Sequence, residues 1–410
     1  MSDFSTKLSR YAQLLVIRGM NVENGDEVQV NFEGSESEEL ALLVAEQAYQ
    51  RGAKHVHLAY RHPKLIRAKI GSTDNDSRIH YPSYESNRFD HLVESGGCYL
   101  DIRSNPCPTI FDSVSDRIDL HQSALKKVRG RFFSHGINKG LITWCIACVP
   151  SVQASAMVYP HLNNVQAVAA FWEAVFRMTM CQDDQFLSRW ENCENTLKDR
   201  VSQLNTANLS SVRFIGPETD LTVGLCEESC WVGGSKKSGK GKMFTANIPS
   251  YEVYSTPNRI RTEGWFRSHK PLVISGVIVE KPLLEFSNGQ VMRVESESNV
   301  EVLRKHLAID EGASYLGEVA LVTSDSPIAK ENTVFYNTVF DENASCHVAT
   351  GMGYSAGIKD GWSRNEAELL ALGKNTSTIH DDIMINSMEV SGVSKSGSRV
   401  SLIKDGEWVM

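Results

Sequence analysis

The first part of the chain alternates between helical and extended patterns of hydrophobic residues. Residues 5–20 repeat apolar positions with the period of an amphipathic helix, and residues 28–32 then alternate as a strand does. A second helical pattern ends at Gly52, and a second strand is expected at 55–60. This succession of strand, helix and strand predicts a βαβ unit and therefore a parallel sheet.

The same α/β pattern continues toward the middle of the chain. Apolar runs at 99–106 and 141–150 predict two more strands. Residues 164–206 have the pattern of long amphipathic helices, which we expect to connect the two halves of the protein.

The pattern of hydrophobic residues changes after about residue 208. Short apolar runs now alternate with Gly, Ser and Asn turns, which is typical of a β-rich domain with a mixed, curled sheet. One helix is expected within it, at 299–309. We therefore predict an N-terminal α/β domain with a parallel sheet and a helical bridge at 1–207, and a C-terminal β-rich domain of α+β type at 208–410.

Composition places the chain among globular proteins and limits its partners. It has 410 residues, 41% of them hydrophobic and 22% charged, with a net charge of −8, so we expect a folded protein with more than one core. The acidic balance argues against a nucleic-acid partner. There is no apolar run long enough to span a membrane and no secretory signal pattern, so we expect no membrane association and a cytoplasmic location.

Three patterns that resemble functional motifs have simpler explanations. The Cys145–Cys148 pair matches CxxC, but it lies within an apolar run and no second CxxC completes a zinc site, so a buried strand is expected. The segment 234–241 resembles a phosphate loop, but Gly241 stands where that motif needs Ser or Thr, and a hairpin loop is expected instead. His55 and His57 share one face of a strand, which we interpret as a partly exposed surface.

The chemistry of this chain is concentrated in acids and histidines of the C-terminal part. Glu318 stands between apolar residues in YLGEVALV, where a carboxylate needs a partner or a metal ion. Glu342 and His347 are five residues apart in a polar segment. His380 and Asp382 are two apart, so an extended strand directs both to one side. Spacing alone leaves two interpretations open, a metal site and a buried ion-pair network.

Several blocks of the sequence resemble a known family. They are ANIPSYEVYSTPNR, RTEGWFRSHKPL, YLGEVALV, DSPI, VFYNTVFDENASCHVATGMGY and NTSTIHDD. Together, in this order, they are similar to the metalloaminopeptidases that include aminopeptidase T and aminopeptidase S. The N-terminal half is similar more loosely, so that the resemblance covers nearly the full length.

The resemblance implies a set of site residues. The implied metal ligands are Glu252, Glu318, Glu342, His347, His380 and Asp382. Glu342 is implied as either a ligand or the general base, and Tyr354 as the active-site tyrosine. One departure is the Ser250–Tyr251 pair, where the family has Thr-Glu before the matched Glu252. We expect this departure to affect substrate preference and not the metal ligands.

The activity of this family gives the function that we expect of the chain. The resemblance implies a metal-dependent aminopeptidase that uses two divalent metal ions, zinc, cobalt or manganese, to hydrolyse the first peptide bond of short peptides with a free N-terminus. It also implies a homodimer. Glu318 would be the carboxylate shared by the two metal ions. Two alternatives are a ring-cleaving dioxygenase with one iron(II), which needs only one carboxylate, and a non-catalytic metal- or peptide-binding protein.

Overall fold

The structure is a computed structural model that describes residues 3–72, 74–104, 118–274 and 276–410. It divides into two compact units, Met1–Glu191 with Ser235–Ser250, and Asn192–Gly234 with Tyr251–Met410. The expected domain boundary between residues 207 and 208 stays a prediction.

The first unit contains a five-stranded parallel sheet in the order β10-β4-β3-β1-β2. Its strands are β1 (Glu27–Glu33), β2 (His55–Arg61), β3 (Cys98–Arg103), β4 (Thr143–Cys148) and β10 (Asn247–Ile248). The predicted strands are therefore confirmed, although residues 105 and 106 of the third lie outside the described part of the chain. The parallel arrangement agrees with the βαβ pattern of the sequence.

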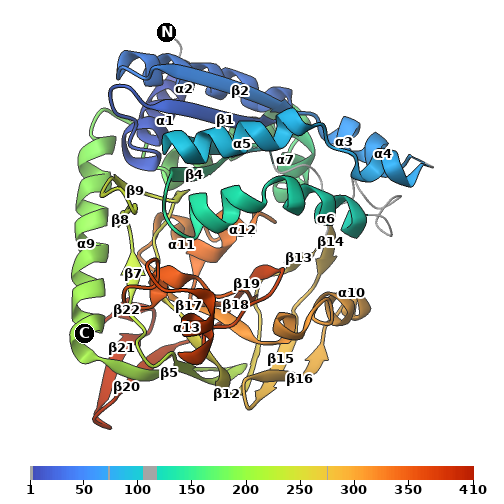
Figure 1. The fold of residues 1–410 in the computed structure, drawn as a ribbon. Coiled ribbons are helices and arrows are strands. Elements are labelled where there is room, and N and C mark those ends of the chain that lie inside the picture. The colour runs from blue at the N-terminus through green and yellow to red at the C-terminus, as the bar shows by residue number, and fades with distance from the viewer. Residues whose placement is uncertain (1–2, 73, 105–117, 275) are drawn as a thin grey trace. The chain divides into compact units, whose positions relative to one another are not determined.

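Helices surround this sheet. The described helices are α1 (Asp3–Leu14), which continues as the π-helical turn Leu15–Gly19, then α2 (Glu38–Gln50), α3 (Pro63–Ile70), α4 (Asn75–Ile79), α5 (Ser83–Ser95), α6 (Ile118–Val128), α7 (Val152–Val158) and α8 (Asn164–Met178). Figure 1 shows α2 and α5 running beside β1, against which both pack. None of the helices that the structure describes is both long and apolar enough to cross a bilayer.

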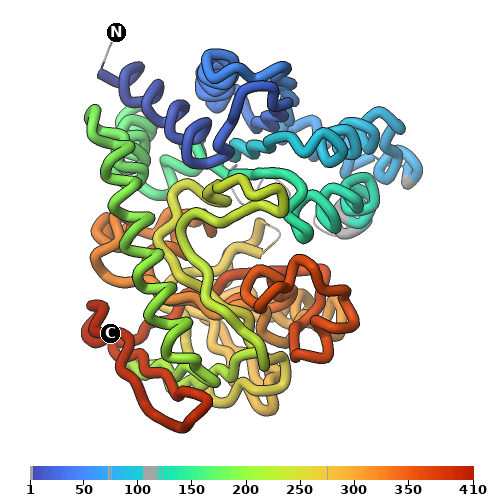
Figure 2. Tube along the Cα trace, turned by 60° about the vertical axis from the view of Figure 1, so that its left-hand side comes forward, coloured from blue at the N-terminus to red at the C-terminus, as the bar shows by residue number. Residues whose placement is uncertain are grey.

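The second unit is built mainly from two antiparallel sheets, and it also contains a two-stranded sheet of β13 (Leu272–Ile274) and β14 (Val277–Val279). The larger has the order β16-β15-β12-β6-β5-β20-β21-β22, with strands β5 (Leu209–Gly216), β6 (Thr219–Leu225), β12 (Pro257–Arg267), β15 (Leu283–Ser287), β16 (Gln290–Glu295), β20 (Glu389–Ser394), β21 (Arg399–Lys404) and β22 (Glu407–Trp408). Figure 2 shows the C-terminal β20–β21 hairpin, in red, folded back along the strand β5 with which it pairs.

The smaller sheet positions the candidate site. Its order is β19-β18-β17-β11-β7, and its strands are β7 (Val232–Gly233), β11 (Val253–Ser255), β17 (Leu316–Leu321), β18 (His347–Gly351) and β19 (His380–Met384). One apolar core joins residues of both sheets, including Phe214, Phe266 and Val319. This parallel α/β unit and antiparallel β-rich unit confirm the predicted fold class.

Helical segments complete the second unit and the connection to it. They are α9 (Phe186–Ala207), which is one unbroken helix in Figure 2, then α10 (Val300–His306), α11 (Pro327–Glu331), α12 (Thr338–Asp341) and α13 (Glu366–Ala371), with 3-10 turns at Glu342–Ala344 and Ser355–Gly357. The helix predicted at 299–309 is therefore present, although shorter.

The three motif-like patterns have the simple structures expected of them. His55 and His57 are exposed residues of β2. Cys145 and Cys148 are buried residues of β4 that form no disulfide. The segment 234–241 leads into a hairpin of β8 (Lys236–Lys237) and β9 (Met243–Phe244), without a helix start at which a phosphate would bind. The eight described cysteines form no disulfide, and Cys107 lies outside the described residues.

Candidate metal centre

The five-stranded sheet of the second unit has one apolar face and one polar face. Its apolar face belongs to the core and includes Val253, Val319, Val348 and Ile383. Because side chains alternate along a strand, the residues between these project from the opposite face. That face receives Glu318 from β17, His347 from β18, and His380 and Asp382 from β19, while Glu252 directly precedes β11.

The strand register places these side chains in neighbouring rows, where a row is a set of residues that are paired across adjacent strands. Glu318 is paired with Ala349, and Ala349 with Asp382, so one alanine separates two carboxylates. In the next row, Ala320 is paired with His347. Alanine carries only a methyl group, and the two alanines therefore leave space between the longer acidic and imidazole side chains.

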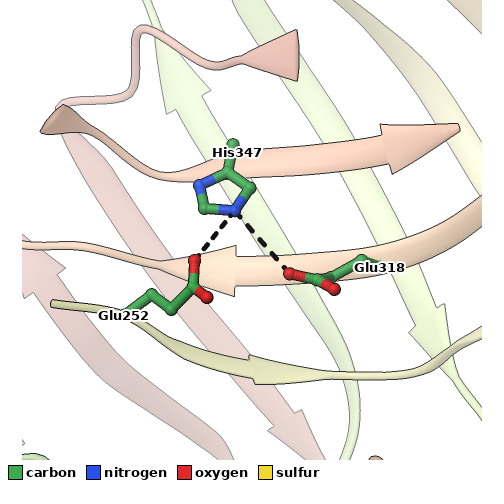
Figure 3. Close-up of side chains that lie close together, drawn as sticks. All are labelled: Glu252, Glu318 and His347. Atoms are coloured by element: carbon green, nitrogen blue, oxygen red, sulfur yellow. Dashed lines mark ion pairs between the residues drawn. The ribbon is translucent and has the colours of Figure 1, made fainter. Parts of the chain in front are cut away.

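Three of the predicted site residues converge closely (Figure 3). Glu252, Glu318 and His347 each offer an atom within 4.8 Å of the others. The Nε2 atom of His347 lies 3.2 Å from Glu252 Oε2 and 3.7 Å from Glu318 Oε1. All three residues are buried, with His347 at 0% exposure. Oxygen and nitrogen atoms at these separations are arranged as donors around a divalent cation.

The second histidine approaches the other oxygen of the same glutamate. His380 Nε2 lies 3.6 Å from Glu318 Oε2 and 3.6 Å from Asp382 Oδ1. Asp382 Oδ1 is also 3.9 Å from His347 Nε2. The two oxygens of Glu318 thus face different imidazoles.

Backbone carbonyl groups orient both imidazole rings. His347 Nδ1 lies 3.2 Å from the carbonyl oxygen of Ser345, and His380 Nδ1 lies 2.7 Å from that of Met352. A ring whose Nδ1 donates to a carbonyl oxygen carries its free lone pair on Nε2. In both histidines that nitrogen points toward the carboxylates.

Two polar atoms at the centre form no hydrogen bond within the described part of the chain. Glu252 Oε2 and His347 Nε2 are buried and form no hydrogen bond, although they lie 3.2 Å apart. Among the described residues, the ion pairs of Glu252, Glu318 and Asp382 involve histidine only and no lysine or arginine. Buried charges without a partner are costly. A cation satisfies such groups, so the residues fit a metal ion.

Burial and crowding shift the proton equilibria of these groups in the metal-free protein. Burial raises the pKa of the Glu318 carboxyl above its ordinary value, although His347 opposes the shift. Burial, together with the charges of Asp382 and Glu252, raises the pKa of Glu342 well above its ordinary value. Burial alone would lower the pKa of His347, but the two glutamates outweigh it and raise that pKa. Carboxylates packed this closely resist ionising together.

Glu342 approaches the centre from outside the sheet. It begins a 3-10 turn after α12, and it is 6% exposed. The side-chain amide of Asn343 donates to Glu342 Oε1 at 3.3 Å, and its oxygen accepts from the backbone N–H of Tyr251 at 2.6 Å. Asn343 therefore joins the segment before Glu252 to the segment of Glu342. The sequence analysis missed this asparagine because its contact with Tyr251 joins segments that are far apart in the chain.

Tyr354 lies over the second histidine, with a ring-to-ring distance of 4.6 Å from His380. Gly317 allows the backbone of Met352, whose carbonyl oxygen contacts His380 Nδ1, to approach β17, because a Cβ atom on Gly317 would lie 2.3 Å from that oxygen. A second tyrosine, Tyr254, stands 6.2 Å from Tyr354 in a T-shaped contact. The sequence analysis did not select Tyr254, although its position two residues after Glu252 in an extended segment would have indicated it.

Comparison with known proteins agrees with this geometry. A family model described as thermophilic metalloprotease (M29) matches residues 4–408. The chain is 32% identical to aminopeptidase AmpS of Bacillus subtilis and 33% identical to aminopeptidase T of Thermus aquaticus, over 100% of this chain and of each relative. The solved structure of wild-type AmpT from Thermus thermophilus is similar, with a TM-score of 0.90 and 32% identity over 99% of this chain and 100% of that one. The chain belongs to the thermophilic metalloprotease family M29.

Proposed function

We propose that this protein is a metal-dependent aminopeptidase that hydrolyses the N-terminal peptide bond of short peptides. The observation that carries the proposal is the divided environment of Glu318, whose two oxygens face His347 and His380 separately. The family membership and the names of the relatives, which are aminopeptidases, support the same activity.

We assign the metal ligands from these distances. Glu252 and His347 would hold one cation, and His380 and Asp382 the other, with Glu318 shared between them. The donors are carboxylate oxygens and imidazole nitrogens, without thiolate, and such a set suits zinc, cobalt or manganese. Two cations held here would polarise the scissile carbonyl group and lower the pKa of a water molecule toward neutrality.

The remaining side chains would move protons and stabilise charge. We assign Glu342 as the general base, because it comes from a turn beside the sheet and its Oε1 is already held by Asn343. Its carboxylate would accept a proton from the attacking water and return it to the leaving amine. The Tyr354 hydroxyl would donate to the carbonyl oxygen as negative charge develops there, an interaction of several kcal/mol in related reactions.

The substrate and assembly follow from the family resemblance. We propose peptides with a free α-amino group as substrates, a homodimer as the assembly, and the cytoplasm as the location. Tyr251, in place of the family's glutamate, would influence which N-terminal residue is preferred; it is 4% exposed. A dioxygenase with a single iron ion would need one carboxylate, whereas three carboxylates face the two imidazoles here.

The first test is metal-dependent hydrolysis. Protein stripped of metal would be assayed on aminoacyl p-nitroanilides and short peptides, with zinc, cobalt, manganese or iron restored singly, and metal content measured in parallel. We expect release of N-terminal residues only with metal present, and none from N-acetylated substrates. Binding of two metal ions per chain without any hydrolysis would favour the non-catalytic alternative.

A further inference from the structure

A tyrosine outside the implied ligand set shares the polar face of the sheet. Tyr254 is paired with Ala320 across β11 and β17, and residues paired in this way project from the same face. Ala320 is in turn paired with His347. Tyr254 therefore lies in the same row as this histidine and on the same face as Glu318.

The Tyr254 side chain is buried but its hydroxyl group is not engaged by the protein. It is 9% exposed, and no hydrogen bond of its hydroxyl occurs within the described part of the chain. Its ring contacts Tyr354 at 6.2 Å, and Tyr354 in turn contacts His380 at 4.6 Å. A buried phenol usually finds a hydrogen-bond partner. Here a molecule that enters the site, either substrate or solvent, can supply that partner.

The site as a whole needs hydrogen-bond donors. The carboxylates accept hydrogen bonds and cations only, and both histidines already donate through Nδ1 to backbone carbonyl oxygens. Hydrolysis of an amide places negative charge on its carbonyl oxygen, which needs donors besides a cation. A tyrosine hydroxyl is protonated at neutral pH and can donate such a hydrogen bond.

We propose that Tyr254 is a second catalytic tyrosine, whose hydroxyl donates a hydrogen bond to the carbonyl oxygen of the peptide bond being cleaved. This assignment rests on the proposed aminopeptidase function. Tyr354 and Tyr254 would both donate to that oxygen. Tyr354 would do so from its position over the His380 ring, and Tyr254 from the line of paired residues that also contains Ala320 and His347. Because the contact strengthens as the oxygen becomes negative, its loss would lower kcat more than it changes KM.

The test is Tyr254→Phe, which removes only the hydroxyl oxygen. We expect about a 10- to 100-fold lower kcat, with a change in KM below about threefold, two metal ions per chain as in the wild type, and an unchanged melting temperature. The surface tyrosine Tyr84, which is 66% exposed, provides the matched control as Tyr84→Phe. Binding of a phosphinic peptide, a mimic of the tetrahedral state, would be measured by calorimetry and should weaken by a similar factor in Tyr254→Phe only.

The possible outcomes separate the two proposals. An active wild type together with an unaffected Tyr254→Phe overturns the assignment of Tyr254 and leaves the aminopeptidase function intact. Loss of metal ions from Tyr254→Phe also overturns it, because the residue would then support the site structurally. A metal-loaded wild type that hydrolyses no peptide with a free α-amino group overturns the proposed function, and the assignment with it.

Discussion

Buried acids occur in both units, and the contrast between them is informative. In the parallel sheet, Asp101 is 5% exposed and is held by Arg61 Nη2 at 2.5 Å and by Arg103 Nε at 3.0 Å. In the antiparallel sheet, Glu252 and Glu318 are equally buried but meet imidazole and no guanidinium group. The first acid is paired with permanently charged groups, whereas the others meet imidazoles, which are charged only when protonated.

The pKa values of the buried acids in the two units differ in the same way. Burial would raise the pKa of Asp101, but the two arginines outweigh it and lower that pKa. The pKa of Glu318 is raised instead. A buried acid with its own cation therefore indicates a structural role, and a group of buried acids without one indicates a metal site.

The strongest test of this contrast is Glu318→Gln. The amide keeps the shape of the side chain but loses the shared charge, so we expect kcat/KM to fall at least about 1000-fold, or about 4 kcal/mol. Metal content should fall while the fold is retained. Glu285→Gln, on an exposed strand glutamate of the same unit, is the control. Activity above about a tenth of the wild type in Glu318→Gln would contradict the shared role.

The corresponding test in the first unit is Asp101→Asn, which changes the buried acid that is paired with arginine. This change leaves Arg61 and Arg103 without a carboxylate, and removing one partner from a buried ion pair costs about 3 kcal/mol of unfolding free energy. Metal content should be unchanged. Urea unfolding would measure the loss, with Asp220→Asn in the exposed pair with Arg213 as the control. A cost as small as that of the control would remove the distinction between the two sheets.

A smaller effect is expected from pH. The pKa values of Glu318 and His347 are raised in the folded, metal-free protein. Their stabilisation is therefore fully present below the unfolded values of 4.5 and 6.5, and is lost as pH rises through the folded values. Asp101 has the opposite sign, with stabilisation lost as pH falls below its ordinary value of 3.8.

Unfolding of metal-stripped protein between about pH 5 and pH 8 would measure this dependence. We expect the unfolding free energy to decrease toward pH 8, and the decrease to disappear or reverse when metal is restored, because metal binds the deprotonated ligands. An identical slope in Glu318→Gln would mean that other groups cause it.

The smallest effect is expected from Cys346, next to a proposed ligand. It belongs to the apolar core on the other face of the sheet, and its sulfur donates to the Val322 carbonyl oxygen at 3.4 Å. Cys346→Ala should cost about 1 kcal/mol of unfolding free energy and leave metal content and turnover unchanged. A large loss of metal would show that the two faces of the sheet are not independent.

Much of this arrangement could be predicted from the sequence, because strands impose a period of two. That period predicts that His380 and Asp382 share a face and that Cys346 points away from His347, and the core contacts of Cys346 agree. An acid between apolar residues also indicated Glu318. These predictions needed only local information.

Other features depended on which strands pair. Nothing near Ala320 or Ala349 in the sequence indicates that they separate the site residues, since this follows from the register of β17, β18 and β19. The bond between Asn343 and the backbone of Tyr251 joins residues 92 positions apart. Tyr254 was within reach of the same period-two argument, but a tyrosine in a strand is so common that only its unpaired hydroxyl distinguishes it.

The order of the ligands along the chain has a consequence for biosynthesis. Glu252 is translated first, but the partners that complete the centre follow one strand at a time, and His380 and Asp382 come last, in β19. During synthesis, the nascent chain therefore lacks the last ligands of its metal centre until β19 has been made. A centre assembled in this order stays incomplete, and therefore inactive, until these ligands have been translated.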